Sequence, residues 1–227
     1  MATHLDLEEQ EQLEQFRAFW KRYGNLITWL VIAALSAVAG WNGWNWYQRD
    51  QAIKASSMFE ELDRAAAAGE SQRVDSVFHD LKTRYPKVAY TQQAGLLAAK
   101  VQFDKGNVGE AITALTWVSE NGKEMEYRVL ARLRLAGIYV DQKKFNEALT
   151  ELEKAASGAS PEFLALIDDR RGDVFMAQDK KNDAVAAYRK AWDAMDAELE
   201  YRRLIEAKLT ALAAAPAPSK AASGVAP

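Results

Sequence analysis

The chain has 227 residues, of which 29 are Lys or Arg and 32 are Asp or Glu, so its formal net charge is −3. Proteins that bind nucleic acid usually carry an excess of basic residues to neutralise phosphates, so this balance argues against nucleic acid as a partner. The sequence contains no cysteine, which excludes disulfides, thiolate metal sites and cysteine nucleophiles. With 49% hydrophobic and 27% charged residues, the chain is neither disordered nor wholly embedded in a membrane.

An uncharged, apolar stretch near the N-terminus has the length of a membrane span. Residues 23–48 contain no Asp, Glu, Lys, Arg or His. A helix rises about 1.5 Å per residue, so roughly 20 residues cross the hydrocarbon layer of a bilayer. Aromatic residues, which prefer the headgroup boundary, stand at both ends of the stretch: Trp20, Tyr23, Trp41, Trp44, Trp46 and Tyr47. The sequence therefore predicts a transmembrane helix over 23–48 that passes once through the lipid bilayer.

Two other interpretations of this stretch remain open. A buried core helix would rarely keep so many consecutive uncharged residues. A cleaved signal peptide is suggested by Ala37 and Ala39, because their small-x-small spacing has the form of a cleavage site. Against cleavage, the uncharged stretch continues beyond Ala39 to Gln48 and contains three further tryptophans, as a retained anchor would.

The basic residues beside the stretch favour one orientation. Three of them are clustered directly before it: Arg17, Lys21 and Arg22. Those after it are more widely spaced: Arg49, Lys54 and Arg64. By the positive-inside rule, residues 1–22 are predicted to form a cytoplasmic N-terminal tail, with the large C-terminal part across the membrane.

From residue 49 to residue 213 the sequence has helical periodicity and an internal repeat of 36 to 37 residues. Three positions keep this interval: a small residue, a large one four residues later and an apolar one three residues after that. The twelve residues are Val74, Phe78, Leu81, Ala111, Leu115, Val118, Ala148, Leu152, Ala155, Ala184, Tyr188 and Ala191. A helical bundle core would explain each residue alone but not the shared interval. The pattern resembles the second helix of a tetratricopeptide repeat, so we predict an all-α fold in which a single transmembrane helix precedes a helical-hairpin solenoid at 49–213.

The first helices of the repeats are less regular. Ala136 with Tyr139 and Gly172 with Phe175 have the expected small and aromatic residues, whereas Phe103 is one residue out of phase, which predicts a turn shortened by one residue near Gly106. In the first repeat, Leu62 and Ala65 replace the small and aromatic residues, so its first helix is predicted to be degenerate.

Local signals predict where helices begin and end. The predicted N-caps are Ser71, Asn182 and Ser160, the last followed by Pro161 at the first helical position. A last helix, about Ala197 to Leu212, is predicted to cap the solenoid. Residues 214–227 contain three of the five prolines among Ala, Ser and Gly, and are predicted to be a disordered tail.

No motif in the sequence indicates chemistry, so the sequence predicts no enzyme and no catalytic, cofactor-binding or metal-binding residue. His4 lies in the N-terminal tail and His79 is expected on a helix surface. Asp168 and Asp169 are adjacent in a helix and are expected on different faces. Pairs of arginines could mark a polar groove, although such pairs are more often solvated: Arg132 with Arg134, Arg170 with Arg171, and Arg202 with Arg203. Function is therefore expected in a groove for peptides or folded partners.

Three segments carry a resemblance to a known family: the acidic segment 6–12 (DLEEQEQ), the segment 21–25 (KRYGN) and the segment 41–48 (WNGWNWYQ). Followed by divergent repeats, they resemble the ancillary SecYEG translocon subunit family, the YfgM-like proteins of Gram-negative bacteria. The likeness extends to about residue 213.

The resemblance implies a single-pass inner-membrane protein with a cytoplasmic N-terminus and a periplasmic repeat domain. It implies association with the SecYEG translocon and with a membrane-anchored periplasmic peptidyl-prolyl isomerase-like chaperone (PpiD), in the hand-over of exported client proteins. Two alternatives stay open: a cytoplasm-facing membrane-bound adaptor that sequesters a signalling protein, and an envelope organiser that does not contact clients.

Overall fold

The computed structural model describes residues 7–196 and 198–215, and within them all regular secondary structure is helical. The helices are α1 (Leu7–Ala67), α2 (Ser71–Arg84), α3 (Ala89–Asp104), α4 (Val108–Asn121), α5 (Met125–Asp141), α6 (Phe145–Ala156), α7 (Pro161–Ala177), α8 (Lys181–Ala194) and α9 (Glu200–Ala211). Contacts divide the chain into two compact parts, with the boundary between Gln51 and Ala52. His4 and nearly all of the predicted tail, residues 216–227, lie outside the described residues.

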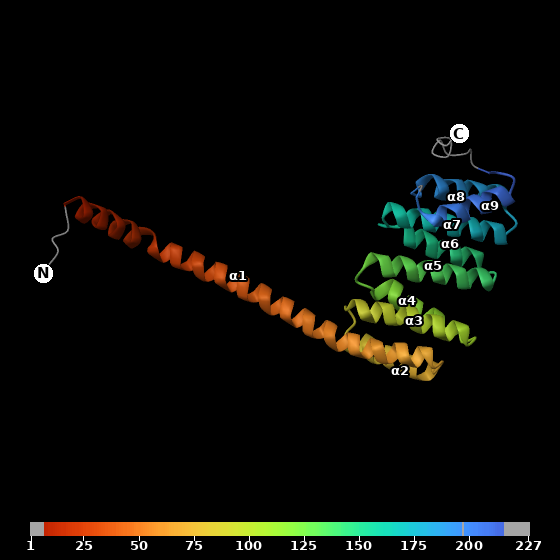
Figure 1. The fold of residues 1–227 in the computed structure, drawn as a ribbon, viewed down its shortest axis with the longest axis horizontal. Coiled ribbons are helices and arrows are strands. Elements are labelled where there is room, and N and C mark those ends of the chain that lie inside the picture. The colour runs from red at the N-terminus through yellow and green to blue at the C-terminus, as the bar shows by residue number, and fades with distance from the viewer. Residues whose placement is uncertain (1–6, 197, 216–227) are drawn as a thin grey trace, which may run out of the picture. The chain divides into compact units, whose positions relative to one another are not determined.

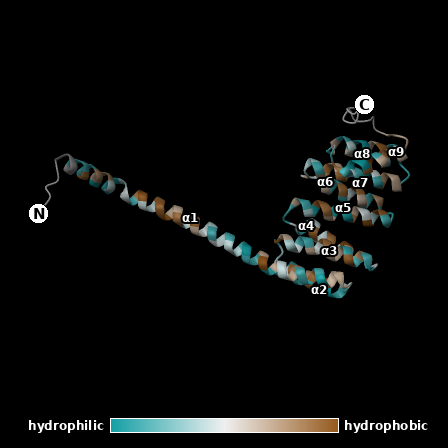
Figure 2. Ribbon diagram, in the orientation of Figure 1, coloured by the Kyte–Doolittle hydropathy of each residue, from teal (hydrophilic) through white to brown (hydrophobic). Residues whose placement is uncertain are grey.

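The first helix, α1, is 61 residues long and has no end at either boundary of the predicted span 23–48. Residues 7–22, predicted as part of a tail, are helical. Within the part of the chain that the structure describes, α1 is the one helix long and apolar enough to cross a membrane by length and composition. Its large apolar side chains are exposed, for example Trp29, Leu30, Leu35 and Trp41, and Figure 2 shows the hydrophobic residues along its middle.

From Ala52 onward the helices form antiparallel pairs that stack in chain order from α2 to α9 (Figure 1). Four repeats consist of residues 52–67 of α1 with α2, α3 with α4, α5 with α6, and α7 with α8. The most extensive helix contacts lie within the pairs α3–α4, α5–α6 and α7–α8, and the next lie between successive pairs. The predicted solenoid of helical hairpins is confirmed for this part of the chain.

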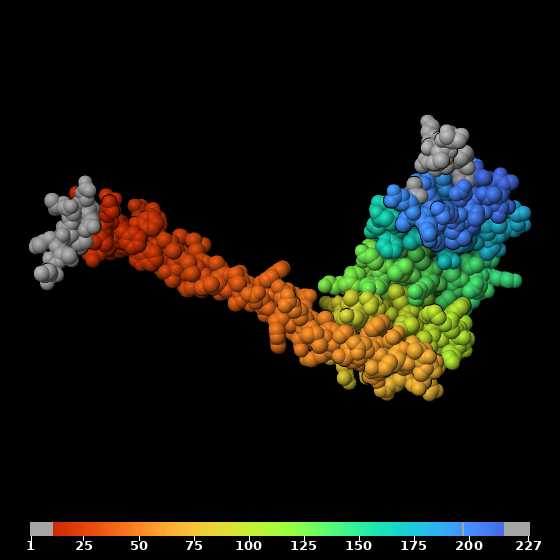
Figure 3. All heavy atoms as spheres, viewed as in Figure 1, coloured from red at the N-terminus to blue at the C-terminus, as the bar shows by residue number. Residues whose placement is uncertain are grey.

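All twelve residues of the sequence repeat are buried, none more than 3% exposed. Two of the larger residues pack on glycines of first helices: Phe78 lies near Gly95 of the next repeat, and Tyr188 lies over Gly172 of its own repeat. Close approach is most extreme at two glycines of the first helices. A Cβ on Gly95 would lie 2.4 Å from Cγ2 of Val118, and one on Gly172 would lie 2.3 Å from Cε1 of Tyr188. Side chains of successive repeats pack into a continuous body on the face that Figure 3 shows.

The turn within each repeat has the same geometry. One residue in each turn has positive φ, and these residues keep the repeat interval: Gly69, Gly106, Lys143 and Asp179. The next residue donates its backbone N–H to the carbonyl five residues back, as from Asn107 to Gln102 at 2.9 Å. These are the hydrogen bonds of a Schellman motif, which satisfies carbonyls at a helix end.

The prediction of a shortened turn near Gly106 is wrong, because this turn keeps the common interval. Gln102 instead occupies the position that Tyr139 and Phe175 have in later repeats, and its side chain is buried. Its amide donates to the carbonyl of Ser71 at 3.1 Å and accepts from Nδ2 of Asn107 at 2.7 Å. A hydrogen-bonded amide therefore replaces an aromatic ring, and Phe103 is left 39% exposed.

Three predicted helix starts need correction. Ser71 and Asn182 lie inside α2 and α8, whose N-caps are Glu70 and Lys180, because the Schellman turn fixes the N-cap one residue after the left-handed residue. The last helix begins at Glu200 rather than near Ala197.

The remaining N-cap prediction is confirmed, since Ser160 is the N-cap of α7 and Pro161 is its first residue. The Ser160 hydroxyl donates to Oε2 of Glu162 at 2.6 Å, and this hydrogen bond lowers the pKa of Glu162. In the first repeat, Leu62 and Ala65 are both buried within α1, so the degenerate positions still contribute to the core.

Candidate interaction surface

The first helices of the repeats form one face of the solenoid, made by residues 52–67 of α1 with α3, α5 and α7. We call it the first-helix face. The contacts of α5 with α3 and α7 place these helices side by side along it. The curvature of stacked repeats creates the extended concave surfaces with which solenoid proteins bind partners. Two hollows lie along the first-helix face.

The first hollow lies between the end of α1 and α3 and has a volume of about 410 Å³. Its lining combines small apolar residues with charges of both signs: Asp63, Ala66, Ala67, Gly69, Leu97, Lys100, Val101, Asp104 and Lys105. Lys100 and Asp104 form an ion pair one helical turn apart. Two basic residues, Lys100 and Lys105, and two acidic ones, Asp63 and Asp104, line this hollow, so no single sign of charge dominates it.

The second hollow lies over α3, α5 and α7 and has a volume of about 380 Å³. It is lined by Ala99, Lys100, Phe103, Leu115, Leu133, Arg134, Gly137, Ile138, Asp141 and Arg170. Nη1 of Arg134 donates to the carbonyl of Leu96 at 2.9 Å, and partial desolvation of its side chain lowers the pKa of Arg134. Nη1 of Arg170 lies 3.5 Å from Oδ2 of Asp173. This hollow thus combines apolar walls with three basic side chains.

A polar cluster joins α7 to the last helix, α9. Nζ of Lys208 lies 2.8 Å from Oδ1 of Asp169 and 2.7 Å from Oδ1 of Asp173. The hydroxyl of Tyr201 donates to Asp169 and that of Tyr188 donates to Asp173, each at 2.8 Å. Burial of Tyr188 and partial burial of Tyr201 raise the pKa of these tyrosines, and the hydrogen bonds to the carboxylates raise it further. Because each carboxylate of this cluster has basic and hydroxyl partners, the cluster attaches α9 to the fourth repeat.

Asp168 and Asp169 have different partners, as their positions in the helix predict. Asp168 is paired with Nη1 of Arg171 at 2.7 Å and with Nζ of Lys190 at 2.9 Å. Both carboxylates are nevertheless buried, which the sequence did not indicate.

The predicted arginine pairs do not share one groove. Arg134 and Arg170 line the second hollow, from α5 and α7. Three other arginines contact neighbouring side chains within the fold. Arg132 forms an ion pair with Glu151 at 2.7 Å, and Arg171 forms one with Asp168. The guanidinium of Arg202 lies 4.0 Å from the ring centre of Trp192. Equivalent positions in successive repeats could have identified the hollow, because Arg134 and Arg170 are separated by the repeat interval.

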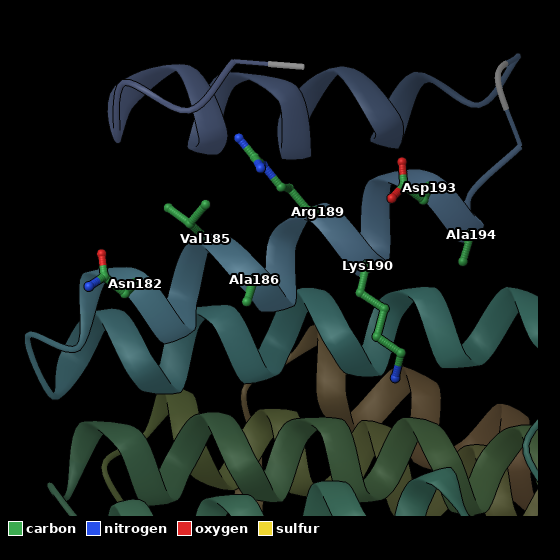
Figure 4. Close-up of a pocket in the computed structure, with 7 residues that line it drawn as sticks. All are labelled: Asn182, Val185, Ala186, Arg189, Lys190, Asp193 and Ala194. Atoms are coloured by element: carbon green, nitrogen blue, oxygen red, sulfur yellow. The ribbon is translucent and has the colours of Figure 1, made fainter. Parts of the chain in front are cut away.

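A larger and shallower hollow of about 770 Å³ lies along α8. Figure 4 shows that Val185 and Arg189 point toward α9, whereas Lys190 points the opposite way, toward α7 and its partner Asp168. One helix supplies the whole lining, and its charges are mixed because Asp193 faces the same hollow. It therefore offers less enclosure than the hollows between first helices.

His79 is exposed on α2, as predicted. Among the described residues, no group of three or more His, Asp or Glu side chains is placed to hold a metal ion.

Sequence comparison extends from the N-terminal helix to α9. The model of a tetratricopeptide repeat-like domain family matches residues 17–214. The ancillary SecYEG translocon subunit of Neisseria gonorrhoeae is 31% identical over 216 residues, which cover 93% of this chain and all of that protein. This chain belongs to the ancillary SecYEG translocon subunit family. The family's Escherichia coli member is 25% identical over 82% of this chain, and its Haemophilus influenzae member is 23% identical over 80%. These two matches cover 86% and 85% of the relatives, so the similarity extends over most of their length.

Proposed function

We propose that this protein is a membrane-anchored scaffold that associates with the SecYEG translocon and holds protein partners on its first-helix face. The observation that carries the proposal is the similarity over nearly the whole chain to proteins named as ancillary subunits of that translocon. An enzymatic role is not proposed.

The proposed organisation has four parts: a cytoplasmic tail (1–22), a transmembrane helix (23–48), a repeat domain (49–213) and a disordered tail (214–227). The exposure of large apolar side chains along α1 supports the membrane span, because lipid tails solvate such side chains and water does not. The clustered Arg17, Lys21 and Arg22 support a cytoplasmic N-terminus and a periplasmic repeat domain.

In this arrangement the anchor keeps the repeat domain near the exit of the translocon and raises its effective concentration there. The proposed role is to help exported proteins pass from SecYEG to periplasmic chaperones. The resemblance to the YfgM-like proteins suggests the membrane-anchored peptidyl-prolyl isomerase-like chaperone PpiD as a second partner.

Protease treatment of spheroplasts tests the orientation. A periplasmic repeat domain is digested while the inner membrane is intact and a cytoplasmic marker protein stays protected. Digestion only after the membrane is broken would contradict the proposal and favour the cytoplasm-facing adaptor.

Photo-crosslinking in native membranes tests the partners. A photoreactive residue at Lys100, on the first-helix face, should capture a SecYEG subunit, the chaperone or an exported chain. The matched control is a photoreactive residue at His79, which is exposed on α2 and lines neither hollow of that face. Equal capture from both positions would argue against a specific binding face, and the envelope-organiser alternative predicts capture of no exported chain from either.

A further inference from the structure

The part of α1 that precedes the predicted membrane span has a distinct apolar side. Successive residues of an α-helix are turned by about 100°, so the places of residues 11–23 around the axis follow from their numbers. Gln12 is the one polar residue of this segment that falls on the apolar side. The five other residues there lie within an arc of about 120°, and we call them the N-terminal apolar face: Leu13, Phe16, Phe19, Trp20 and Tyr23.

The N-terminal apolar face is a connected surface. All five residues are exposed, from 42% at Tyr23 to 62% at Phe16. Phe16 and Trp20 stack with their ring centres 6.3 Å apart, and the ring centres of Phe19 and Tyr23 are 5.1 Å apart. A contiguous exposed apolar surface of this kind marks contact with a protein or a membrane.

This face is continuous with the predicted membrane span, because it ends at Tyr23 and the span covers 23–48. A straight helix perpendicular to the bilayer would nevertheless not bury it. With a rise of about 1.5 Å per residue, Phe16 would lie about 10 Å and Leu13 about 15 Å beyond the hydrocarbon layer. The headgroup layer on each side is only about 5–8 Å thick, so both side chains would be in water.

The charged residues around the face fit a lipid surface. Arg17 and Lys21 lie on one side of the arc and Arg22 lies on the other, whereas Glu11 and Glu14 lie nearly opposite its centre. Helices that lie in the membrane interface have this arrangement: apolar residues enter the acyl boundary, and long basic side chains beside them reach the headgroups. The apolar face and its basic flanks therefore indicate the same partner, a phospholipid bilayer.

Two features allow α1 to bend directly after the face. Gly24 and Asn25 both have low helix propensity. Oγ1 of Thr28 donates to the carbonyl of Gly24 at 2.8 Å, and hydrogen bonds from Thr to the carbonyl four residues back often bend helices. A bend at Gly24 would turn residues 11–23 parallel to the membrane surface.

We propose that residues 11–23 form an amphipathic helix that lies in the bilayer surface on the N-terminal side of the span, with α1 bent at Gly24. This inference rests on the proposed membrane span and adds a second membrane contact to it. The apolar face enters the boundary between headgroups and acyl chains, and the three basic side chains reach lipid phosphates. The surface segment holds the span at one depth, because sliding along the bilayer normal would move the face into water.

Spin labelling of the full-length protein in nanodiscs of phosphatidylcholine and phosphatidylglycerol tests the proposal. The chain has no cysteine, so each introduced cysteine carries a single nitroxide label. Gln12→Cys reports on the N-terminal apolar face without changing its five residues, and Ala18→Cys is the matched control on the opposite side of the helix. The label at 12 should be more accessible to oxygen, which concentrates in lipid, than to a water-soluble nickel complex. The label at 18 should show the reverse.

A third label, at Leu35→Cys in the middle of the predicted span, reports on the span itself. Exclusion of nickel at 35 with nickel access at both 12 and 18 would leave the proposed span intact and overturn the inference. Low access of both reagents at 12 would also overturn it, since protein rather than lipid would then cover the face. Nickel access at 35 would instead reject the membrane span on which the inference depends.

The distance between labels at Gln12 and Leu35 tests the bend. Their Cα atoms would be about 34 Å apart in a straight helix and about 24 Å apart after a right-angle bend at Gly24. Pulsed electron paramagnetic resonance should give the shorter distance, and the longer one would overturn the bend.

A double variant tests whether the apolar face holds the segment on the bilayer. Phe16→Gln with Trp20→Gln removes the centre of the face, and glutamine preserves the helix because its helix propensity is high. The label at 12 should then become accessible to nickel. Ala18→Gln is the control and should leave that label in lipid. A label that stays in lipid in the double variant would exclude the face as the membrane contact.

Discussion

The ring of Tyr188 lies directly over Gly172: a Cβ on the glycine would be 2.3 Å from Cε1 of the tyrosine. The hydroxyl at the other end of the ring donates to Oδ1 of Asp173, the residue that follows the glycine. Glycine and tyrosine therefore pack α8 against α7 as a complementary pair, and the hydrogen bond fixes the position of the ring.

Replacing this glycine should destabilise the fold. Gly172→Ala introduces a methyl group into filled space, and overpacking of this kind costs about 1–3 kcal/mol. Gly137→Ala adds the same methyl group in open space and should raise stability by about 0.5–1 kcal/mol. Urea denaturation followed by circular dichroism compares the two variants, and equal effects would contradict the packing argument.

The polar cluster at α9 predicts that Lys208 contributes strongly to the stability of the fold. Lys208→Met leaves Asp169, which is 2% exposed, without its basic partner, and should cost about 3 kcal/mol. Lys190→Met also removes a lysine paired with a buried aspartate, but Lys190 is 69% exposed and Asp168 keeps Arg171. That control should cost less than about 1 kcal/mol. Similar losses of unfolding free energy in both variants would show that the cluster does not hold α9.

At the turn residues with positive φ, introducing glycine and replacing glycine should change the stability of the fold in opposite directions. Lys143 has φ of 58° without being glycine, so Lys143→Gly should relieve backbone strain and raise stability by about 0.5–1 kcal/mol. Gly106→Ala places a side chain on a residue with φ of 81° and should lower stability by about 1 kcal/mol, although open space surrounds it. Thermal unfolding of the two variants measures both signs, and a lower melting temperature for Lys143→Gly would refute the strain argument.

The raised pKa values of Tyr188 and Tyr201 predict instability in alkaline solution. The folded state holds these phenolic protons more tightly than the unfolded chain, in which the tyrosine pKa is 10.0. Their contribution to stability is therefore complete below about pH 10 and declines as the pH rises above it. The double variant Tyr188→Phe with Tyr201→Phe should be less stable at pH 8, because Asp169 and Asp173 lose hydrogen bonds, but its stability should decline less steeply above pH 10. Urea denaturation at several pH values tests this, and parallel declines would exclude the two tyrosines as the cause.

The sequence predicted the features that depend on short-range periodicity. Residues such as Ala148 and Leu152 repeat at a fixed interval and face the core, because a helix with that spacing has one apolar side. Ser160 and Pro161 identified the start of α7 because their backbone preferences are local.

The features that the sequence did not predict depend on distant partners. A polar residue such as Gln102 is expected on the surface, and its burial depends on hydrogen bonds from its amide group to Ser71 and Asn107. Asp169 finds its partners 32 and 39 residues later, on α9, so its burial could not be inferred from its neighbours in α7. The hollow beside Gly137 was missed for a related reason, since the residues that line it come from four helices, α3, α4, α5 and α7.

The identical turns have a consequence for how such a chain changes in length. Gly69 and Gly106 occupy the same geometry with the same hydrogen bonds, so excising residues 70–106 would join two matching ends and leave the flanking helices in register. Excising a few residues more or fewer would rotate every later helix about its axis and expose its apolar side. Insertions and deletions in this domain should therefore be tolerated one whole hairpin at a time, so that its reach grows or shrinks in fixed steps.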